Sequence, residues 1–495
     1  MFSKDTAYQG ASKTSPQLKD WYAKSQSADR DLVSELETIT SRARDLDRND
    51  GLAQGARVTS NDNVIGTGLT LSPKPNYRKL DKDLKWADQW ARKVKAEWID
   101  YSESTFFDAD GEMNFAQATQ LQYNTNYVNG AAIAIPLWLK RKNTPFRTCF
   151  KIIDPDRLCN PDTKPDNLLM RGGVERNANG QIVAYHIRDR HPSDDGTFPV
   201  NFRRWKRIAA YGPDGRQRFI HICGKERPGQ SRGKARATAV LAAFGMRGHY
   251  QLTELQAAIV NSKIAGILES DLSPEEAQEI FGITSDEIQK MHNEWNGKLS
   301  AGAILSTPIG TKFNSHIPNR PQSAYSDYMK VIGREIGTAL SLPIELFARD
   351  FSDTNYSAAR VALLEAWRHF NVERSLFSTQ WASACYRLWM QEAVALGLID
   401  APNYMSFQSA YTRANWLALG FQPVDEFKAA RSVTERLKNG TTTYEREYAQ
   451  MGLDAYEEIE AIYREKAFHK EMAEKYGVDP IQYEESNTIE SPESD

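Results

Sequence analysis

"DFSDTNYSAAR", residues 350–360, lies between two long stretches of helical spacing in this chain. It holds two aspartates, an asparagine, two aromatic residues and several small residues. A segment this polar is not expected in a hydrophobic core. Three roles would explain it: an active-site loop, a binding loop, or a loop that lines a hole.

The chain before this loop is predicted to form a helix, an insertion and a second helix. Apolar residues recur at helical spacing over residues 235–264 and 323–342, and a proline follows the second stretch. The first helix is rich in alanine and glycine, which lets neighbouring helices approach closely. Between the two, capping patterns at residues 273–276 and 284–287 predict short helices, and residues 301–314 predict two short strands.

The remaining pattern predicts a mixed α/β N-terminal half and a helical C-terminal part. Expected helices cover residues 30–60, 80–101, 114–129 and 355–398, with three more capped helices over 423–480. Expected strands cover residues 63–73 and several short runs from 131 to 222, with a hairpin turn at Asn179–Gly180. The expected fold class is α+β and mainly helical.

The composition is that of an ordinary globular protein. The 495 residues are 40% hydrophobic and 26% charged, with a formal net charge of -3. No apolar run is long enough to span a bilayer, and residues 1–24 read as a flexible polar arm without a signal peptide. The four cysteines form no CxxC pair, which favours neutral thiols in a reducing compartment.

The sequence offers no catalytic constellation. Residues 229–235, "GQSRGKA", resemble a phosphate-binding loop but fail its spacing, so a glycine-rich connector into a helix is the better interpretation. The eight histidines form no HxxxH or HExxH pair. The acids near Asp350 and Asp353 lack the ligand spacing of a calcium loop. We therefore expect no enzyme, no metal and no cofactor.

Several motifs together resemble one protein family. In chain order they are "SRARDLDRND", "NVIGTGLTL", "IDPDRL", "GGVERNANGQIVAYHI", "RPGQSRGKA", "GAILSTPIGTKF" and "ARDFSDTNYSAAR". The ordered set is similar to the portal proteins of tailed bacteriophages, the lambda-like group, over about residues 25–465. Small departures are Ala358, where a second serine is familiar, and Lys234, where an apolar residue is commoner.

The resemblance implies a ring, usually of about twelve copies, at one vertex of a viral capsid. Double-stranded DNA would be pumped in through its channel by the terminase and would later leave through it. The implied partners are the large terminase subunit, the major capsid and scaffold proteins, and a head-completion or adaptor protein, with a role in starting procapsid assembly. The implied location is the virion, and the cytoplasm of the infected bacterium during assembly.

The family plan of wing, stem, clip and crown can be laid onto the chain. The expected parts are an arm (1–24), a first wing part (25–234), stem helix 1 (235–265), a clip (266–320), stem helix 2 (321–343), a tunnel loop (344–356), a long helix with the rest of the wing (357–422), a helical crown (423–480) and an acidic disordered tail (481–495).

The resemblance also assigns candidate site residues. The tunnel loop would present Arg349, Asp350, Phe351, Ser352, Asp353, Thr354, Asn355 and Tyr356 to the DNA channel. Lys330 and Arg334 would either face the channel or form salt bridges between subunits. A terminase- or adaptor-facing clip surface would include Glu275, Glu276, Asp286, Glu287 and Lys312.

A loop of mixed charge suits a channel for DNA. Duplex DNA carries a phosphate charge about every 1.7 Å of axis, and every neutralising Lys or Arg adds affinity. A purely basic ring would slow the movement of DNA, whereas mixed charges give a weak contact that is blind to sequence. Two alternatives remain open at this stage: a packaging-associated nuclease or NTPase, which an ATPase assay would reveal, and another head–tail connector, which ring stoichiometry would separate.

Overall fold

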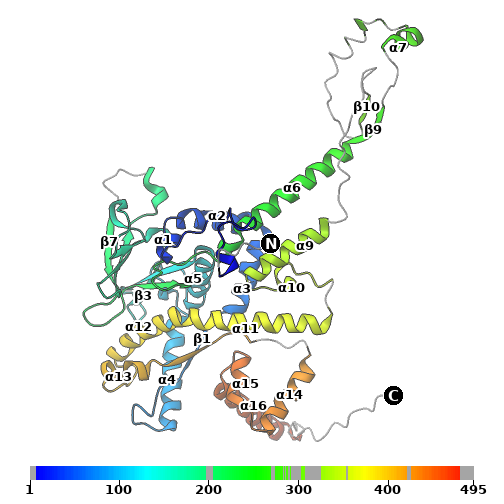
Figure 1. Cartoon of the computed structure of the whole chain (residues 1–495). Coiled ribbons are helices and arrows are strands. Elements are labelled where there is room, and N and C mark those ends of the chain that lie inside the picture. Colours follow the sequence, from blue (N-terminus) through cyan, green and yellow to red (C-terminus); the bar gives the residue numbers. More distant parts are fainter. Residues whose placement is uncertain are drawn as a thin grey trace. The chain divides into compact units, whose positions relative to one another are not determined.

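The computed structural model describes residues 7–196, 204–268, 274–282, 284, 286–287, 290, 303–306, 325–352, 355–420 and 425–479. The chain forms two compact units (Figure 1). Unit 1 consists of Met1–Arg236 and Asn355–Asp495, and unit 2 is the insertion Ala237–Thr354. Short 3-10 turns occur at Gln9–Ala11, Thr105–Phe107, Pro155–Arg157, Pro161–Thr163, Pro192–Gly196 and, as η7, Arg236–Val240.

Unit 1 begins with helices α1 (Ala28–Leu32), α2 (Leu36–Asn49) and α3 (Gly51–Val64). The helical spacing predicted over residues 30–60 is confirmed, but it is divided among three helices, and Asp50 ends α2 and starts α3. The Asp50 carboxylate accepts the backbone N–H groups of Leu52 (2.9 Å) and Ala53 (3.1 Å), an N-cap that fixes a new helix start. The strand expected over residues 63–73 is shorter, since only β1 (Thr70–Pro73) is extended.

An aromatic core lies around helices α4 (Leu84–Ser102) and α5 (Phe115–Asn129), both near their expected positions. Asn114 and Gln117 form a capping box at the start of α5, and Gly130 ends it at φ 76°. Trp98 of α4 contacts Phe115, Tyr386 and Trp389 edge-on, with ring centroids 5.2–5.7 Å apart. This cluster joins segments that are distant in the sequence.

The described strands of unit 1 form three antiparallel sheets. One pairs β1 with β11 (Ala414–Leu417); the second has the order β3 (Thr148–Ile153), β2 (Ala131–Trp138), β8 (Ile220–Cys223); the third has the order β4 (Met170–Arg171), β5 (Val174–Arg176), β6 (Ile182–Arg188), β7 (Trp205–Ala209). The hairpin predicted at Asn179–Gly180 is confirmed between β5 and β6, with Gly180 at φ 81°. Buried Ile133, Val174, Tyr185 and Phe219 connect the second and third sheets in one apolar cluster.

The helix expected over residues 355–398 is two helices, α11 (Tyr356–Gln380) and α12 (Ala382–Ala395). Trp381 breaks the helix at φ -100° and ψ -72°, and its buried indole N–H donates to Thr119 Oγ1 at 2.9 Å. This tertiary contact, which no local pattern encodes, redirects the chain after α11.

The C-terminal helices of unit 1 are α13 (Tyr404–Tyr411), α14 (Glu426–Lys438), α15 (Tyr444–Gln450) and α16 (Ala455–Tyr476). The last three confirm the capped helices predicted there, with Asp425, Thr443 and Asp454 as N-caps. Ser72 donates to Asp454 at 3.0 Å and Lys74 pairs with Glu445 at 2.6 Å. These bonds tie β1 to the caps and first turns of α15 and α16.

Unit 2 contains α6 (Leu241–Lys263), β9 (Ile264–Leu268), α7 (Pro274–Phe281), β10 (Ala303–Ser306), α9 (Tyr325–Ala339) and α10 (Ile344–Phe347). The helices predicted over 235–264 and 323–342 are thus present with slightly different ends. Strands β9 and β10 pair in parallel. The second strand predicted near Pro308 lies outside the described residues. The Tyr250 ring of α6 contacts Tyr325 and Tyr328 of α9, with centroids 5.6 and 5.1 Å away.

Across the described residues, we find no helix that combines the length and apolarity needed to cross a membrane.

Candidate functional site

The tunnel loop predicted over residues 344–356 begins with helix α10, in which Phe347 is buried, and only Arg349–Ser352 form a largely exposed turn. Arg349 adopts a left-handed conformation (φ 53°), and Phe351 is 53% exposed. The Asp350 carboxylate accepts the Ser352 hydroxyl (2.5 Å) and the Ser352 backbone N–H (3.0 Å). Asp353 and Thr354 lie outside the described residues.

The two stem residues singled out from the sequence lie close enough to this turn to affect its charge. The pKa of Asp350 is lowered, first by the Ser352 hydroxyl and backbone N–H, and further by the positive charges of Lys330 and Arg334 on α9. The structure therefore brings Lys330, Arg334 and Asp350 into one mixed-charge group within unit 2.

Asn355 has a structural role that the sequence analysis missed. Its side-chain oxygen caps α11, accepting the Ala358 backbone N–H at 2.8 Å and the Ser357 hydroxyl at 2.9 Å. The signal was present, because asparagine three residues before a small-residue helical turn is a common N-cap. Tyr356 is the first residue of α11.

The predicted clip residues lie on exposed first turns. Glu275 and Glu276 are in the first turn of α7, and both are exposed. Asp286 and Glu287 are also exposed, and Glu287 accepts the Thr284 backbone N–H and hydroxyl, each at 2.9 Å. These bonds lower the pKa of Glu287, the backbone bond most, and they confirm the capping pattern predicted at residues 284–287. Lys312 lies outside the described residues.

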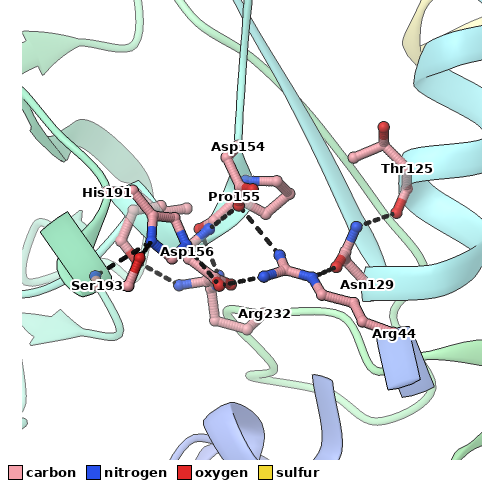
Figure 2. Close-up of polar contacts among 10 residues, drawn as sticks. Arg44, Thr125, Asn129, Asp154, Pro155, Asp156, His191, Ser193 and Arg232 are labelled. Atoms are coloured by element: carbon pink, nitrogen blue, oxygen red, sulfur yellow. Dashed lines mark hydrogen bonds and ion pairs between the residues drawn. The ribbon is translucent and has the colours of Figure 1, made fainter. Parts of the chain in front are cut away.

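A polar cluster in unit 1 joins two of the motifs noted in the sequence (Figure 2). The Arg44 guanidinium donates to Asn129 Oδ1 (2.5 Å), Asp156 Oδ2 (2.5 Å) and Asp154 Oδ1 (3.0 Å). His191 Nε2 lies 3.1 Å from the same Asp156 oxygen.

The ligand atoms of this cluster are close enough together to bind a metal ion, but the positive charge of Arg44 disfavours one. Ligand atoms of Asp154, Asp156 and His191 lie within 4.8 Å of one another. The Arg44 guanidinium already pairs with both carboxylates and would repel a divalent ion. The arrangement is therefore an ion-pair joint between α2, the end of α5 and the segment after β3.

A second joint involves the segment that superficially resembled a phosphate loop. Arg232 is buried and donates to the backbone carbonyls of Leu158 (2.5 Å), Gly172 (3.0 Å) and Pro155 (3.1 Å). The Ser231 backbone N–H and hydroxyl donate to the buried Asp29 carboxylate at 2.6 and 2.8 Å. These bonds hold the segment in the fold, while the buried Arg232 Nε atom has no hydrogen-bond partner among the described residues. The contacts favour a structural connector over a phosphate loop.

The same segment passes very close to the end of α5. A Cβ atom on Gly233 would lie 1.8 Å from the Gly130 carbonyl oxygen, and one on Gly130 would lie 2.1 Å from the Lys234 carbonyl carbon. Both distances exclude any side chain. "RPGQSRGKA", "IDPDRL" and "SRARDLDRND" thus meet through Arg232, Asp156 and Arg44 in one interlocked region.

Comparison with known proteins supports the assignment made from these motifs. Residues 14–374 match the family described as "Phage portal protein, lambda family". The chain belongs to this family. The portal protein of Escherichia phage N15 is 30% identical over 90% of this chain and 86% of its own length. Portal protein B of Escherichia phage lambda is 28% identical over 91% of this chain and 87% of its own length.

Solved structures give a weaker similarity. A chain in the neck of a native gene transfer agent particle, computed with C12 symmetry, has a TM-score of 0.37 and 15% identity, covering 73% of this chain and 90% of that one. A chain in the neck of the empty particle, computed with C6 symmetry, has a TM-score of 0.42 and 14% identity, covering 83% and 93%. The membership of this portal protein in the lambda family rests on the sequence matches.

Proposed function

We propose that copies of this portal protein assemble head to tail into a closed ring at one vertex of a phage head. Double-stranded DNA would enter through the central channel during packaging and leave through it during ejection. The protein would be a structural component of the virion rather than an enzyme. Its similarity to the portal proteins of phages N15 and lambda over most of each chain supports this role.

The observation that carries the ring is the uncovered face of α6. Met246, Leu252 and Leu255 are 64%, 52% and 58% exposed. Gly245 and Gly248 are also exposed, and an added Cβ on either would have no neighbour within 4 Å. Within one chain these small residues are not needed for close packing. A neighbouring copy would use them, because a head-to-tail ring places a subunit on each side of every helix.

Helix α11 supplies a second uncovered surface. Val361, Leu364, Val372 and Leu376 are 66%, 39%, 58% and 61% exposed and follow one side of the helix, while Ala366, Phe370 and Phe377 on the other side are buried. A stripe of this kind on a helix normally faces a partner. We propose that this stripe is a subunit interface of unit 1.

The four-part plan follows from this proposal. Unit 2, Ala237–Thr354, nearly coincides with the expected stem, clip and tunnel loop, in which α6 and α9 would be the stem helices. Unit 1 would hold the wing, and α14, α15 and α16 would form the crown. The partners would be the large terminase subunit, the capsid and scaffold proteins, and a head-completion protein.

The turn at Arg349–Ser352 would line the channel. The supporting observation is its mixed charge: Asp350 is exposed enough to face water, and Lys330 and Arg334 act on it electrostatically. Such a ring of turns would balance phosphate attraction with repulsion, leaving a weak contact. The acids of α7 and the Thr284–Glu287 turn would face the terminase or adaptor.

The first test is the mass of the purified full-length protein, with negative-stain images of the same sample. A closed ring of about a dozen subunits with an axial hole is expected. Leu255→Glu should shift the protein to monomers, because it places a charge in the interface of every copy. Gln89→Glu, at an exposed polar position of α4 outside both proposed interface surfaces, is the matched control.

A monomer or dimer that persists at high protein concentration would contradict the ring. Hydrolysis of ATP or cleavage of DNA by such a species would move the assignment to a packaging-associated enzyme.

A further inference from the structure

The chain leaves unit 1 at Arg236, and this residue is held by two other elements of the same unit. The Arg236 guanidinium pairs with the Glu373 carboxylate of α11 and donates to His369 Nε2 at 2.9 Å. The Tyr123 hydroxyl of α5 donates to the other Glu373 oxygen at 2.9 Å. Side chains of Arg236, His369 and Glu373 are 33%, 29% and 17% exposed, so the cluster is half-buried.

The contact between Arg236 and His369 fixes the protonation state of the imidazole. A guanidinium has only donors, so the Nε2 atom that it contacts must carry a lone pair. His369 is therefore neutral, with its proton on Nδ1. A protonated His369 could not accept this hydrogen bond and would place a second positive charge beside Arg236.

We propose that Arg236, His369 and Glu373 form a proton-sensitive latch that fixes the chain where it leaves unit 1 and releases it when His369 is protonated. Protonation would exchange one partner of the Glu373 carboxylate for another. His369 Nε2 lies 3.5 Å from the Glu373 oxygen that pairs with Arg236, so a protonated imidazole competes for that oxygen. Arg236 then loses its acceptor on His369 and shares its carboxylate.

The other groups around the latch do not titrate in the same range. The two tyrosines of α5 that face it, Tyr123 and Tyr127, have pKa values raised by burial, so both stay neutral. The pKa of His369 is lowered by burial and further by the charge of Arg236. Release is therefore expected below the ordinary histidine value of about 6.5.

The latch acts on a short segment only. Arg232 is held by three buried carbonyl contacts, and Gly233 and Lys234 are interlocked with Gly130. None of these contacts changes with pH. Movement can therefore start only at Arg236, in the first turn of η7.

Amide hydrogen exchange of the full-length protein tests this latch directly. Peptides that cover residues 236–244 would be followed at about pH 7.5 and about pH 4.5, on either side of the histidine range, after correction for the intrinsic exchange rate. We expect protection to fall about tenfold on acidification, while peptides around Gly130 remain protected. Equal protection of residues 236–244 at both pH values would overturn the proposal.

Single substitutions distinguish release caused by protonation of His369 from other effects of low pH on the protein. His369→Gln keeps a side-chain acceptor but cannot be protonated, so protection should persist at low pH. Glu373→Gln removes the charge that Arg236 and His369 share, so protection should be low at both pH values. His249→Gln, at an exposed position of α6, is the control and should respond like the unchanged protein. An unchanged acid response in His369→Gln would contradict the latch.

A third variant gives an independent test if His369→Gln or Glu373→Gln prevents folding. Tyr123→Phe removes one donor to Glu373, which leaves the carboxylate freer to pair with a protonated His369. The pH midpoint of release should therefore rise. A midpoint that stays fixed or falls would show that Glu373 does not couple to the imidazole. The readout does not depend on ring formation, so it is independent of the proposed channel function.

Discussion

Gly233 shows how strongly one residue is constrained by the interlocked region of unit 1. Its backbone approaches the Gly130 carbonyl so closely that a Cβ atom would lie 1.8 Å from that oxygen and 3.2 Å from the Cys223 Cβ. The obstruction is backbone, which cannot rotate away. The region around Gly233 must therefore separate if any side chain is added.

Gly233→Ala should destabilise unit 1 by about 3 kcal/mol or more, because the added methyl group forces apart α5 and the Arg232–Lys234 segment. Chemical unfolding of the monomeric protein measures this loss. Gly224→Ala is the matched control, since a Cβ at Gly224 meets nothing within 4 Å. Similar stabilities for the two variants would show that the close approach is not obligatory.

His221 makes a separate prediction about pH. Its Nε2 atom is buried without a hydrogen-bond partner, and burial, with the charges of Arg232 and Lys225, lowers the pKa of His221 to about 3. The unfolded chain binds this proton at about pH 6.5 and the folded chain only near pH 3. Stability from neutral His221 is thus complete above about pH 6.5 and declines as the pH falls towards 3.

The decline should approach about 1.4 kcal/mol per pH unit for this one proton. Unfolding free energies measured across that range should fall less steeply in His221→Gln than in the unchanged protein. His249→Gln, an exposed histidine, should leave the slope unchanged. Parallel slopes in all three proteins would refute the assignment.

At the scale of single residues, contacts between neighbours in the sequence were predictable, and contacts between distant residues were not. The turn at Asn179–Gly180 and the rejection of a phosphate loop at residues 229–235 needed only neighbouring residues. The joint made by Arg44 needed Asp154 and Asp156, which lie 110 and 112 residues away. No spacing rule connects such positions, so the sequence could not predict this joint.

At the scale of helices and strands, the caps were the most predictable features. Asp454 starts its helix where the capping pattern placed it, and α15 starts from Thr443, one residue after the cap position that the pattern favoured. The break at Trp381 could not be predicted, because it depends on an indole hydrogen bond to Thr119 of another helix. The division at Asp50 was predictable in principle, since its carboxylate is a standard N-cap, but continuous apolar spacing concealed it.

The cap of α11 gives a prediction at this scale. Asn355→Ala removes the acceptor for the Ala358 N–H and should cost about 1 kcal/mol, whereas Asn355→Asp keeps the acceptor and should be nearly neutral. Thermal unfolding of both variants gives the comparison. Equal losses in the two would mean that the amide is needed for some contact other than the cap.

At the scale of the whole molecule, the family and the mainly helical α+β class were predictable because many short motifs occur in a fixed order. The compact unit Ala237–Thr354 overlaps the residues assigned to the stem, clip and tunnel loop, and that assignment stays a prediction. The assembly is different in kind. The proposed ring would depend on surfaces such as the exposed sides of α6 and α11, whose exposure becomes visible only once the fold shows what covers them.

The charge of the proposed ring leads to the last prediction. The protein carries a formal net charge of -3, and Asp350 is an acid that Lys330 and Arg334 partly balance. Asp350→Asn keeps an acceptor for Ser352 but removes one negative charge from every copy. With less negative charge beside Lys330 and Arg334, the proposed ring should bind duplex DNA several-fold more tightly and with a steeper salt dependence.

Fluorescence anisotropy with a short duplex, over a series of salt concentrations, measures both effects. Asp327→Asn is the matched control, because Asp327 is an exposed acid in the first turn of α9. If the turn lines the channel, the Asp350→Asn protein should bind duplex DNA more tightly than the Asp327→Asn protein, and its binding should depend more steeply on salt. Equal changes would place Asp350 away from the DNA path, even if the ring itself forms.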